Sequence, residues 1–171
     1  GDSRESTLVH FLDIILYRAG KEDKVEEMNE HLRRAILTRS VMFEKAEAEC
    51  ELSVNKYQKE YTGFNAQNSA EKDDRIDIYL KFMILVPIAG RHELEIFIEN
   101  KVDTLEHDSQ TKRYFEACGN GGNERSFQLF VYLTPQSLRD MDHYAELNRD
   151  MRPECPHYIH ICYQDIVDYV I

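Results

Sequence analysis

Three side chains in the middle of the chain have the types and the spacing of a hydrolytic site. Asp77 lies in one stretch of alternating polar and apolar residues, and Glu99 and Lys101 lie in the next such stretch. Two carboxylates that converge repel each other unless a cation compensates them. Mg²⁺ is a hard cation that binds one or two carboxylates and keeps waters for a phosphate. A lysine on the same face can orient or deprotonate an attacking water, so the set predicts metal-assisted hydrolysis of a phosphodiester.

Two strands joined by a tight turn must carry these residues. Apolar side chains alternate with polar ones over 75–84 and again over 93–99, which is the period of a strand. The segment 87–91 (PIAGR) between them is a hairpin turn signal. By this alternation all three polar side chains leave the apolar layer on the same side, opposite Ile76 and Ile78 in the first strand.

The register of this hairpin has two alternatives. A turn centred on Ile88 puts Asp77 directly across from Glu99. A turn centred on Ala89 puts Asp77 across from Lys101 and diagonal to Glu99. Directly opposed Cβ atoms lie about 5 Å apart and diagonal ones about 7–8 Å apart, so in either register two carboxylates can reach one ion.

The pattern along the rest of the chain predicts an α/β layer fold, because strands alternate with helices. Polar residues without periodicity indicate a loop at 63–74, and the run GNGGN at 119–123 indicates a turn. The other expected elements are helices over 4–18, about 23–47 and 107–118, strands near 50–60, 126–134 and 157–163, and a last helix that begins in QDIVDYVI.

The composition is that of one folded domain with an acidic balance. The 171 residues are 42% hydrophobic and 31% charged, which is ordinary for a globular protein. Four cysteines without CxxC spacing favour reduced thiols, and we expect a cytoplasmic protein. The formal charge of −11 works against a nucleic-acid partner, because phosphate is bound by Lys and Arg. A local basic rim and a bound metal can offset that average.

The order of the motifs resembles the PD-(D/E)xK nuclease superfamily. RID at 75–77 is followed by IENK at 98–101 and then by Gln110 and Tyr114 in a Q-x-x-x-Y pattern. The later segments VYLTP and YIHICYQDIVDY, at 131–135 and 158–169, are similar to a prokaryotic branch of that superfamily.

Two positions depart from the family pattern. Ile76 stands where the family name has proline. The acidic residue often found on the first helix has only Glu5 as a candidate, and we prefer to interpret Glu5 with Asp2 as a helix-capping pair.

The resemblance implies a restriction-endonuclease-like core, which is a mixed central sheet of about four strands flanked by helices. It implies a nuclease that needs Mg²⁺ or Mn²⁺ and cuts a nucleic acid, with DNA expected first, and enzymes of this fold often act on duplexes as homodimers. The site residues that it implies are the metal ligands Asp77, Glu99 and the backbone carbonyl of Asn100, the catalytic lysine Lys101, and Gln110, which would orient water or phosphate. Tyr114 shares the helix face of Gln110.

Other polar groups have simpler interpretations. Cys155, His157, His160 and Cys162 have the residue types of a zinc site, but on a strand His157 and His160 point to opposite faces, which favours core packing. A lone histidine such as His107 is more often a surface group. Three cations, Lys112, Arg113 and Arg125, are candidates for a basic rim, although a solvated helix face is the preferred interpretation.

We therefore expect residues 1–171 to form a single nuclease-like domain, with N-terminal helices in 4–48 and the core in 50–171. Gly1 in place of Met, and a last helix that continues to the final residue, lead us to expect a segment of a longer protein with further domains. Two hypotheses remain for its function: a metal-dependent deoxyribonuclease, or an inactive nuclease-like module that binds nucleic acid or protein. A zinc-stabilised C-terminal strand is a third and weaker idea.

Overall fold

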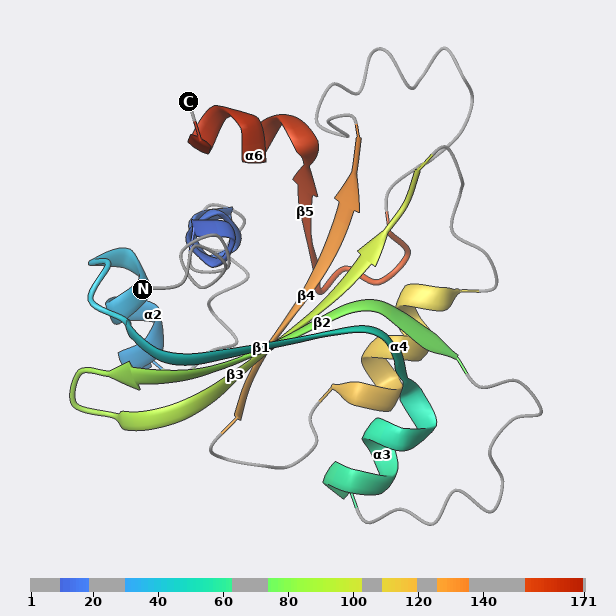
Figure 1. The fold of residues 1–171 in the computed structure, drawn as a ribbon, viewed down its shortest axis with the longest axis horizontal. Helices are drawn as coiled ribbons and strands as arrows, with labels where there is room; N and C mark the ends of the chain where they lie inside the picture. The colour runs from blue at the N-terminus through green and yellow to red at the C-terminus, as the bar shows by residue number, and fades with distance from the viewer. Residues whose placement is uncertain are drawn as a thin grey trace.

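The computed structural model describes residues 10–18, 30–62, 74–102, 109–119, 126–135 and 153–170. In this part of the chain five strands form one sheet in the order β1-β2-β3-β4-β5 (Figure 1). β1, β2 and β3 are antiparallel neighbours, whereas β3, β4 and β5 are parallel. The expected α/β fold with a mixed sheet is confirmed. The elements are a helix over 10–18, α2 (Glu30–Leu37), β1 (Met42–Ser53), α3 (Val54–Thr62), β2 (Arg75–Val86), β3 (Gly90–Asn100), α4 (Gln110–Cys118), β4 (Ser126–Thr134), β5 (Tyr158–Cys162) and α6 (Tyr163–Val170).

The β2–β3 hairpin has the register in which the turn is centred on Ile88. Val86 pairs with Gly90 at the turn, and Ile78 pairs with Ile98 near the open end. Continuing this register by one residue puts position 77 across from position 99. Gly90 has a φ of 86°, a backbone conformation that glycine adopts without steric cost. Of the two predicted registers, the structure has the first.

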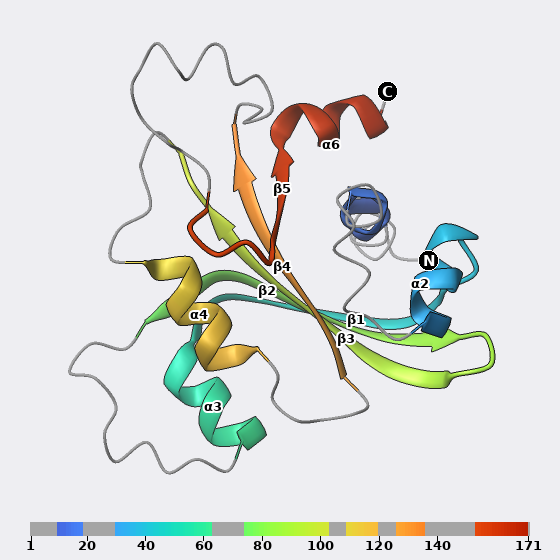
Figure 2. The ribbon, with the colours of Figure 1, turned by 180° about the vertical axis from the view of Figure 1, so that it is seen from behind.

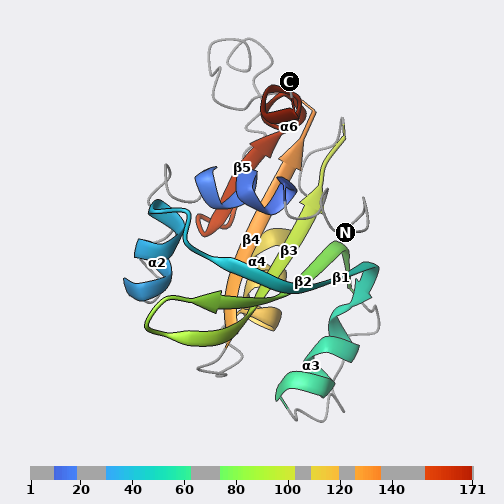
Figure 3. The same ribbon diagram turned by 60° about the vertical axis from the view of Figure 1, so that its left-hand side comes forward.

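One face of the sheet, called here the aliphatic face, packs against the helix over 10–18 and against α2. Figure 3 shows the helix over 10–18 in front of the strands and α4 behind them. Leu12 and Leu32 from these helices are fully buried against it. The strand residues of this face are almost all Leu, Ile or Val, as expected for strands with a buried apolar side. They are Leu80, Phe82, Ile84, Val86, Leu94, Ile96, Ile98, Leu129, Val131, Leu133, Ile159 and Ile161.

The other face, called here the aromatic face, is covered by α3 and α4, which lie side by side in Figure 2. Gln58 of α3 donates a hydrogen bond to the carbonyl of Ala117 in α4, so the two helices are joined directly. Ring packing dominates this face: Phe97 and Phe130 stack with their centroids 4.8 Å apart. Its buried members are Leu52, Val54, Tyr57, Ile76, Tyr79, Phe97, Tyr114, Cys118, Phe130, Tyr132, Cys155 and Tyr158.

A buried carboxylate lies in the middle of the aromatic face. Glu95 in β3 is 2% exposed, and its Oε2 accepts hydrogen bonds from the hydroxyl groups of Tyr57 at 2.8 Å and Tyr79 at 2.7 Å. Gln128 Nε2 donates to Glu95 Oε1, to the Tyr57 hydroxyl and to the carbonyl of Cys118. A buried charge is tolerated only when hydrogen bonds replace its hydration. This network therefore fixes α3 and the end of α4 against the sheet.

Two sequence predictions before the hairpin are wrong. The helix expected over about 23–47 ends at Leu37 in the described residues, and 42–47 belong to β1. The run EKAEAE is rich in helix formers, but pairing with β2 overrides that local preference. The strand expected near 50–60 ends at Ser53, where α3 begins. Ser53 is the N-cap residue of α3, because its Oγ accepts a hydrogen bond from the backbone N–H of Lys56.

The face alternation at the start of β2 also differs from the prediction. Ile78 packs on the aliphatic face, but Ile76 is buried on the aromatic face. Opposite this point Glu51 of β1 has a φ of 56°, so the backbone of the neighbouring strand departs from extended geometry there. The prediction that Asp77 lies opposite both isoleucines is therefore wrong, because Ile76 and Ile78 are on different faces.

The later elements agree with the sequence patterns. The strand predicted over 126–134 is β4, and the strand predicted over 157–163 is β5, which ends at Cys162 because Tyr163 begins α6. The predicted helix over 107–118 is observed from Gln110 onward. The predicted loop at 63–74 and turn at 119–123 lie mostly outside the described residues. No helix in the described ranges is long and apolar enough to cross a membrane.

Candidate active site

Asp77 is held at the open end of the hairpin by the neighbouring strand. Its Oδ2 accepts a hydrogen bond of 2.8 Å from the backbone N–H of Asn100. The paired register extends to Ile78 and Ile98, and beyond that point the Asp77 side chain supplies the acceptor that the Asn100 N–H needs. The carboxylate is therefore fixed beside the end of β3.

Glu99 and Lys101 form a buried pair at the end of β3. Lys101 directly follows β3, and its side chain meets that of Glu99, two residues earlier. Lys101 Nζ lies 3.1 Å from Glu99 Oε1, and only 11% of the lysine and 3% of the glutamate side chain are exposed. Burial of one charge without the other would cost several kcal/mol, so each stabilises the other in place.

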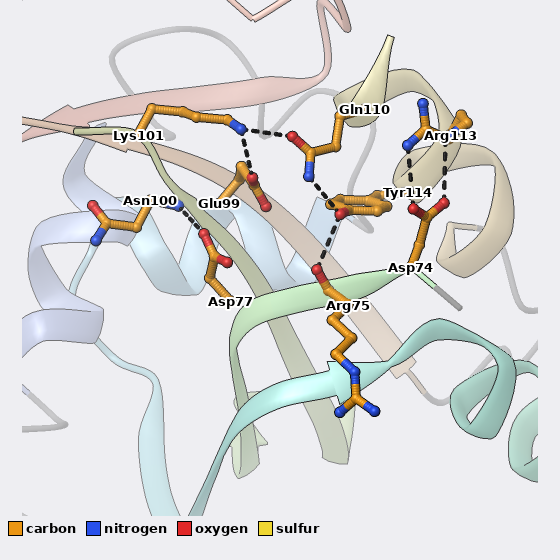
Figure 4. Close-up of polar contacts among 9 residues, drawn as sticks. All are labelled: Asp74, Arg75, Asp77, Glu99, Asn100, Lys101, Gln110, Arg113 and Tyr114. Carbon is orange, nitrogen blue, oxygen red and sulfur yellow. Dashed lines mark hydrogen bonds and ion pairs between the residues drawn. The ribbon is translucent and has the colours of Figure 1, made fainter. Parts of the chain in front are cut away.

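Hydrogen bonds connect this pair to α4 and then back to β2 (Figure 4). Lys101 Nζ donates to Gln110 Oε1 at 2.6 Å, and Gln110 Nε2 donates to the Tyr114 hydroxyl at 2.6 Å. The Tyr114 hydroxyl donates to the carbonyl of Arg75 at 3.0 Å. Because Arg75 and Asp77 lie on the same strand, the contacts form a closed circuit through β2, β3 and α4. Both ends of the Gln110 amide are used, which fixes the direction of the lysine ammonium.

Tyr114 is suited to its role as a donor in this circuit. Burial raises the pKa of its hydroxyl to about 12, and the nearby carboxylates of Glu99, Asp74 and Asp77 act in the same direction. The hydrogen bond from Gln110 opposes part of that rise in the pKa. The hydroxyl therefore keeps its proton at neutral pH and can donate a hydrogen bond to the backbone carbonyl of Arg75.

Asn100 is held on both sides. Its N–H is bound by Asp77, and its side-chain Oδ1 accepts a hydrogen bond of 3.0 Å from the hydroxyl of Tyr163, the first residue of α6. The turn that presents Tyr163 is closed by Asp165, whose Oδ2 accepts from the backbone N–H of Cys162. Sequence reasoning placed Tyr163 in a family-like segment but gave it no role, because a contact between residues 63 positions apart leaves no local signal.

The oxygen donors of the site fit a hard divalent cation. Asp77 and Glu99 offer carboxylate oxygens beside the Asn100 peptide, on the same face as the lysine. Nowhere in the described ranges do three or more His, Cys, Asp or Glu side chains gather into a metal-binding group. Mg²⁺ ordinarily takes one or two carboxylates and completes its shell with waters and substrate phosphate, so the carboxylates of Asp77 and Glu99 suit it.

The structure thus brings together Asp77, Glu99, Asn100, Lys101, Gln110 and Tyr114, all of which the sequence singled out. Glu5, His107 and Arg125 lie outside the described residues. The two remaining rim candidates are paired with acids: Lys112 Nζ lies 3.7 Å from Glu154, and Arg113 binds Asp74.

The four zinc candidates are in separate surroundings. The ring of His157 stacks on Phe115 with centroids 4.4 Å apart, whereas His160 Nε2 is hydrogen-bonded to the hydroxyl of Thr134. Cys162 Sγ donates to Asp165. In the part of the chain that the structure describes, no three of these side chains gather into a metal-binding group.

A five-stranded mixed sheet with two carboxylates and a lysine at the end of its central hairpin defines a nuclease-like class of protein. In agreement, the family model of the PD-(D/E)XK nuclease superfamily matches residues 4–170. The chain belongs to this superfamily. Comparison with curated proteins and with solved structures gives no match.

Proposed function

We propose that the chain is a divalent-metal-dependent nuclease that hydrolyses phosphodiester bonds, with DNA as its substrate. Membership of the superfamily supports a nuclease-like domain. The observation that carries the proposal is the position of Lys101 Nζ, which is 3.1 Å from Glu99 Oε1 and 2.6 Å from Gln110 Oε1 on the face that also presents Asp77.

Each residue has a role in this proposal. Asp77, Glu99 and the carbonyl of Asn100 hold Mg²⁺ or Mn²⁺, which when bound supplies Lewis acidity and a more acidic water. Lys101 directs its ammonium toward the attacking water and offsets phosphate charge, while Gln110 holds the ammonium in that direction. Tyr114 keeps Gln110 in place.

The domain organisation is part of the proposal. Leu12 and Leu32, from the two N-terminal helices, are buried in the same cluster as Ile96 of the central strand. A shared core supports one domain that includes those helices. Action as a homodimer is proposed from the fold class alone.

The test is a cleavage assay with Mg²⁺ or Mn²⁺ on plasmid, single-stranded DNA and RNA. We expect cleavage of DNA by the wild-type chain and a loss of at least about 100-fold in the Lys101→Ala variant. Lys101→Arg keeps a cation beside buried Glu99, and we expect it to fold and to remain strongly impaired. Lys81→Ala is the matched control, because Lys81 also pairs with a glutamate, Glu93, in this hairpin. Equal cleavage by the wild-type chain and both Lys101 variants would overturn the proposal.

A second candidate is an inactive nuclease-like module that binds nucleic acid or protein. The acidic charge of −11 is the observation that favours it, since it opposes the approach of a phosphate backbone. The complete set of carboxylates, lysine and glutamine argues against it. In the same assay, metal-dependent binding of DNA without cleavage would favour this candidate.

A further inference from the structure

The start of β2 is held by contacts from two helices just before the strand presents Asp77. Arg113 of α4 binds the carboxylate of Asp74 at two points, Nε to Oδ2 at 3.2 Å and Nη2 to Oδ1 at 3.2 Å (Figure 4). The Tyr114 hydroxyl donates to the carbonyl of Arg75. The backbone N–H of Val54, the first residue of α3, donates to the carbonyl of Asp74.

The contact between Arg113 and Asp74 differs from the neighbouring ion pair on α4. A guanidinium that meets a carboxylate at two points is held in one orientation, because both groups are planar. Lys112, the adjacent residue, has a single approach of 3.7 Å to Glu154, with 53% of the lysine and 44% of the glutamate side chain exposed. Arg113 and Asp74 are less exposed, at 41% and 29%.

The pair connects the two elements that supply the site. Arg113 lies one helical turn after Gln110, which holds the ammonium of Lys101. Asp74 lies three residues before Asp77, about 10 Å along the extended chain. A shift of α4 against the start of β2 would therefore change the separation between Asp77 and the lysine.

We propose that Arg113 and Asp74 are a positioning pair that sets this separation, and that Arg113 is not a phosphate contact. The inference rests on the proposed nuclease function, and it differs from both sequence-based interpretations of Arg113, a solvated helix face and a basic rim. Removing the pair loosens the metal-binding carboxylate relative to the lysine. It leaves the surface that meets the substrate with the same chemistry.

The two roles predict opposite results for one substitution. If Arg113 contacted a substrate phosphate, Asp74→Asn would release the guanidinium and strengthen DNA binding, and Arg113→Lys would keep the charge and much of the activity. For a positioning pair, Asp74→Asn and Arg113→Lys both remove the two-point contact, and both must impair the site.

The experiment measures Mn²⁺ affinity by calorimetry, together with kcat and KM for DNA cleavage. The variants are Asp74→Asn, Arg113→Lys, their combination, Asp74→Glu and the control Lys112→Gln. We expect Asp74→Asn and Arg113→Lys each to lower Mn²⁺ affinity and kcat by about threefold to fivefold, with KM unchanged. The combined variant loses no more than either single one, because the same contact is removed. Asp74→Glu keeps a carboxylate and restores part of the loss, and Lys112→Gln matches the wild-type chain.

Wild-type Mn²⁺ affinity and kcat in Asp74→Asn, or tighter DNA binding by that variant, would overturn the positioning pair and leave the proposed function intact. Additive losses in the combined variant would also overturn it. If the wild-type chain binds Mn²⁺ but does not cleave DNA, the proposed nuclease activity is wrong. The Mn²⁺ titration of the variants then tests the positioning role of Arg113 and Asp74 by itself. A wild-type chain that neither binds Mn²⁺ nor cleaves overturns both.

Discussion

The aliphatic face of the sheet packs Leu, Ile and Val against the helix over 10–18 and α2, whereas the aromatic face packs tyrosines and phenylalanines against α3 and α4. Among the described residues, the buried carboxylates Glu95 and Glu99 both point from β3 toward the aromatic face. There tyrosine hydroxyls and a lysine ammonium meet them.

The difference shows how one sheet can supply both stability and chemistry. An aliphatic core gains free energy from burial alone and tolerates no charge. A tyrosine-rich face gives similar apolar area and also carries hydroxyl donors that satisfy buried oxygens. The site is therefore built where polar groups already have partners, and the opposite face stabilises the strands that carry them.

The largest effect on stability is expected from the aliphatic face. Ile96→Ala removes a fully buried side chain between the sheet and its helices, and we expect the free energy of unfolding to fall by about 3–4 kcal/mol. Leu85→Ala, at a position 37% exposed on the preceding strand, is the control and should cost much less. Denaturant unfolding measures both. Equal losses would show that this face does not dominate stability.

A smaller loss is expected from the buried carboxylate of the aromatic face. Glu95→Gln keeps the shape but replaces the charge that two tyrosine hydroxyls bind, so we expect a loss of about 2 kcal/mol in the free energy of unfolding. Glu93→Gln, in a part-exposed ion pair two residues earlier, should change it by less than about 1 kcal/mol. If the two variants were equally stable, the network around Glu95 would have no energetic role.

Tyr114→Phe is expected to have a smaller effect on stability and a clear effect on activity. It removes the hydroxyl that binds the Arg75 carbonyl and Gln110, which costs about 1 kcal/mol of unfolding free energy. Without that partner Gln110 holds Lys101 less firmly, so kcat falls. Tyr17→Phe, on the exposed side of the helix over 10–18, is the control. Unchanged kcat in Tyr114→Phe would contradict a role of these hydrogen bonds in positioning Lys101.

The last effect belongs to the aromatic face and is absent at neutral pH. Burial raises the pKa values of Tyr57, Tyr114 and Cys118, to about 12 for Tyr114 and for Cys118. A group whose pKa is raised on folding stabilises the protein below its unfolded pKa, and that stabilisation is lost as the pH rises toward the folded pKa. We expect the unfolding free energy to decline between about pH 9 and pH 12 and to decline less in Tyr114→Phe. A pH titration of denaturant midpoints checks this slope.

The hairpin was predictable because its signals are local. Alternation predicted that Asp77, Glu99 and Lys101 share one face. The observed register, with the turn centred on Ile88, was one of the two predicted registers. Gln110 and Tyr114 followed from helical spacing, four residues apart on one face. The ordered set of motifs also indicated the superfamily, because those motifs are short and local.

The features that the sequence did not predict depend on contacts between segments that are distant along the chain. The run of Glu, Lys and Ala in 44–49 favours a helix by local preference, and only pairing with β2 makes it a strand. The buried network of Glu95 joins residues from α3, β2, β3 and β4, which no spacing rule connects. Arg113 was interpreted as part of a solvated helix face, or of a basic rim, because the sequence does not show that Asp74 lies against it.

The most direct test of the central claim is the position of a metal ion in crystals of the chain soaked with Mn²⁺, located by anomalous scattering. We expect one strong peak between the carboxylates of Asp77 and Glu99, beside the Asn100 peptide and on the side of Lys101. The peak should disappear in Asp77→Asn. A peak elsewhere, or an unchanged peak in that variant, would contradict the proposed metal site.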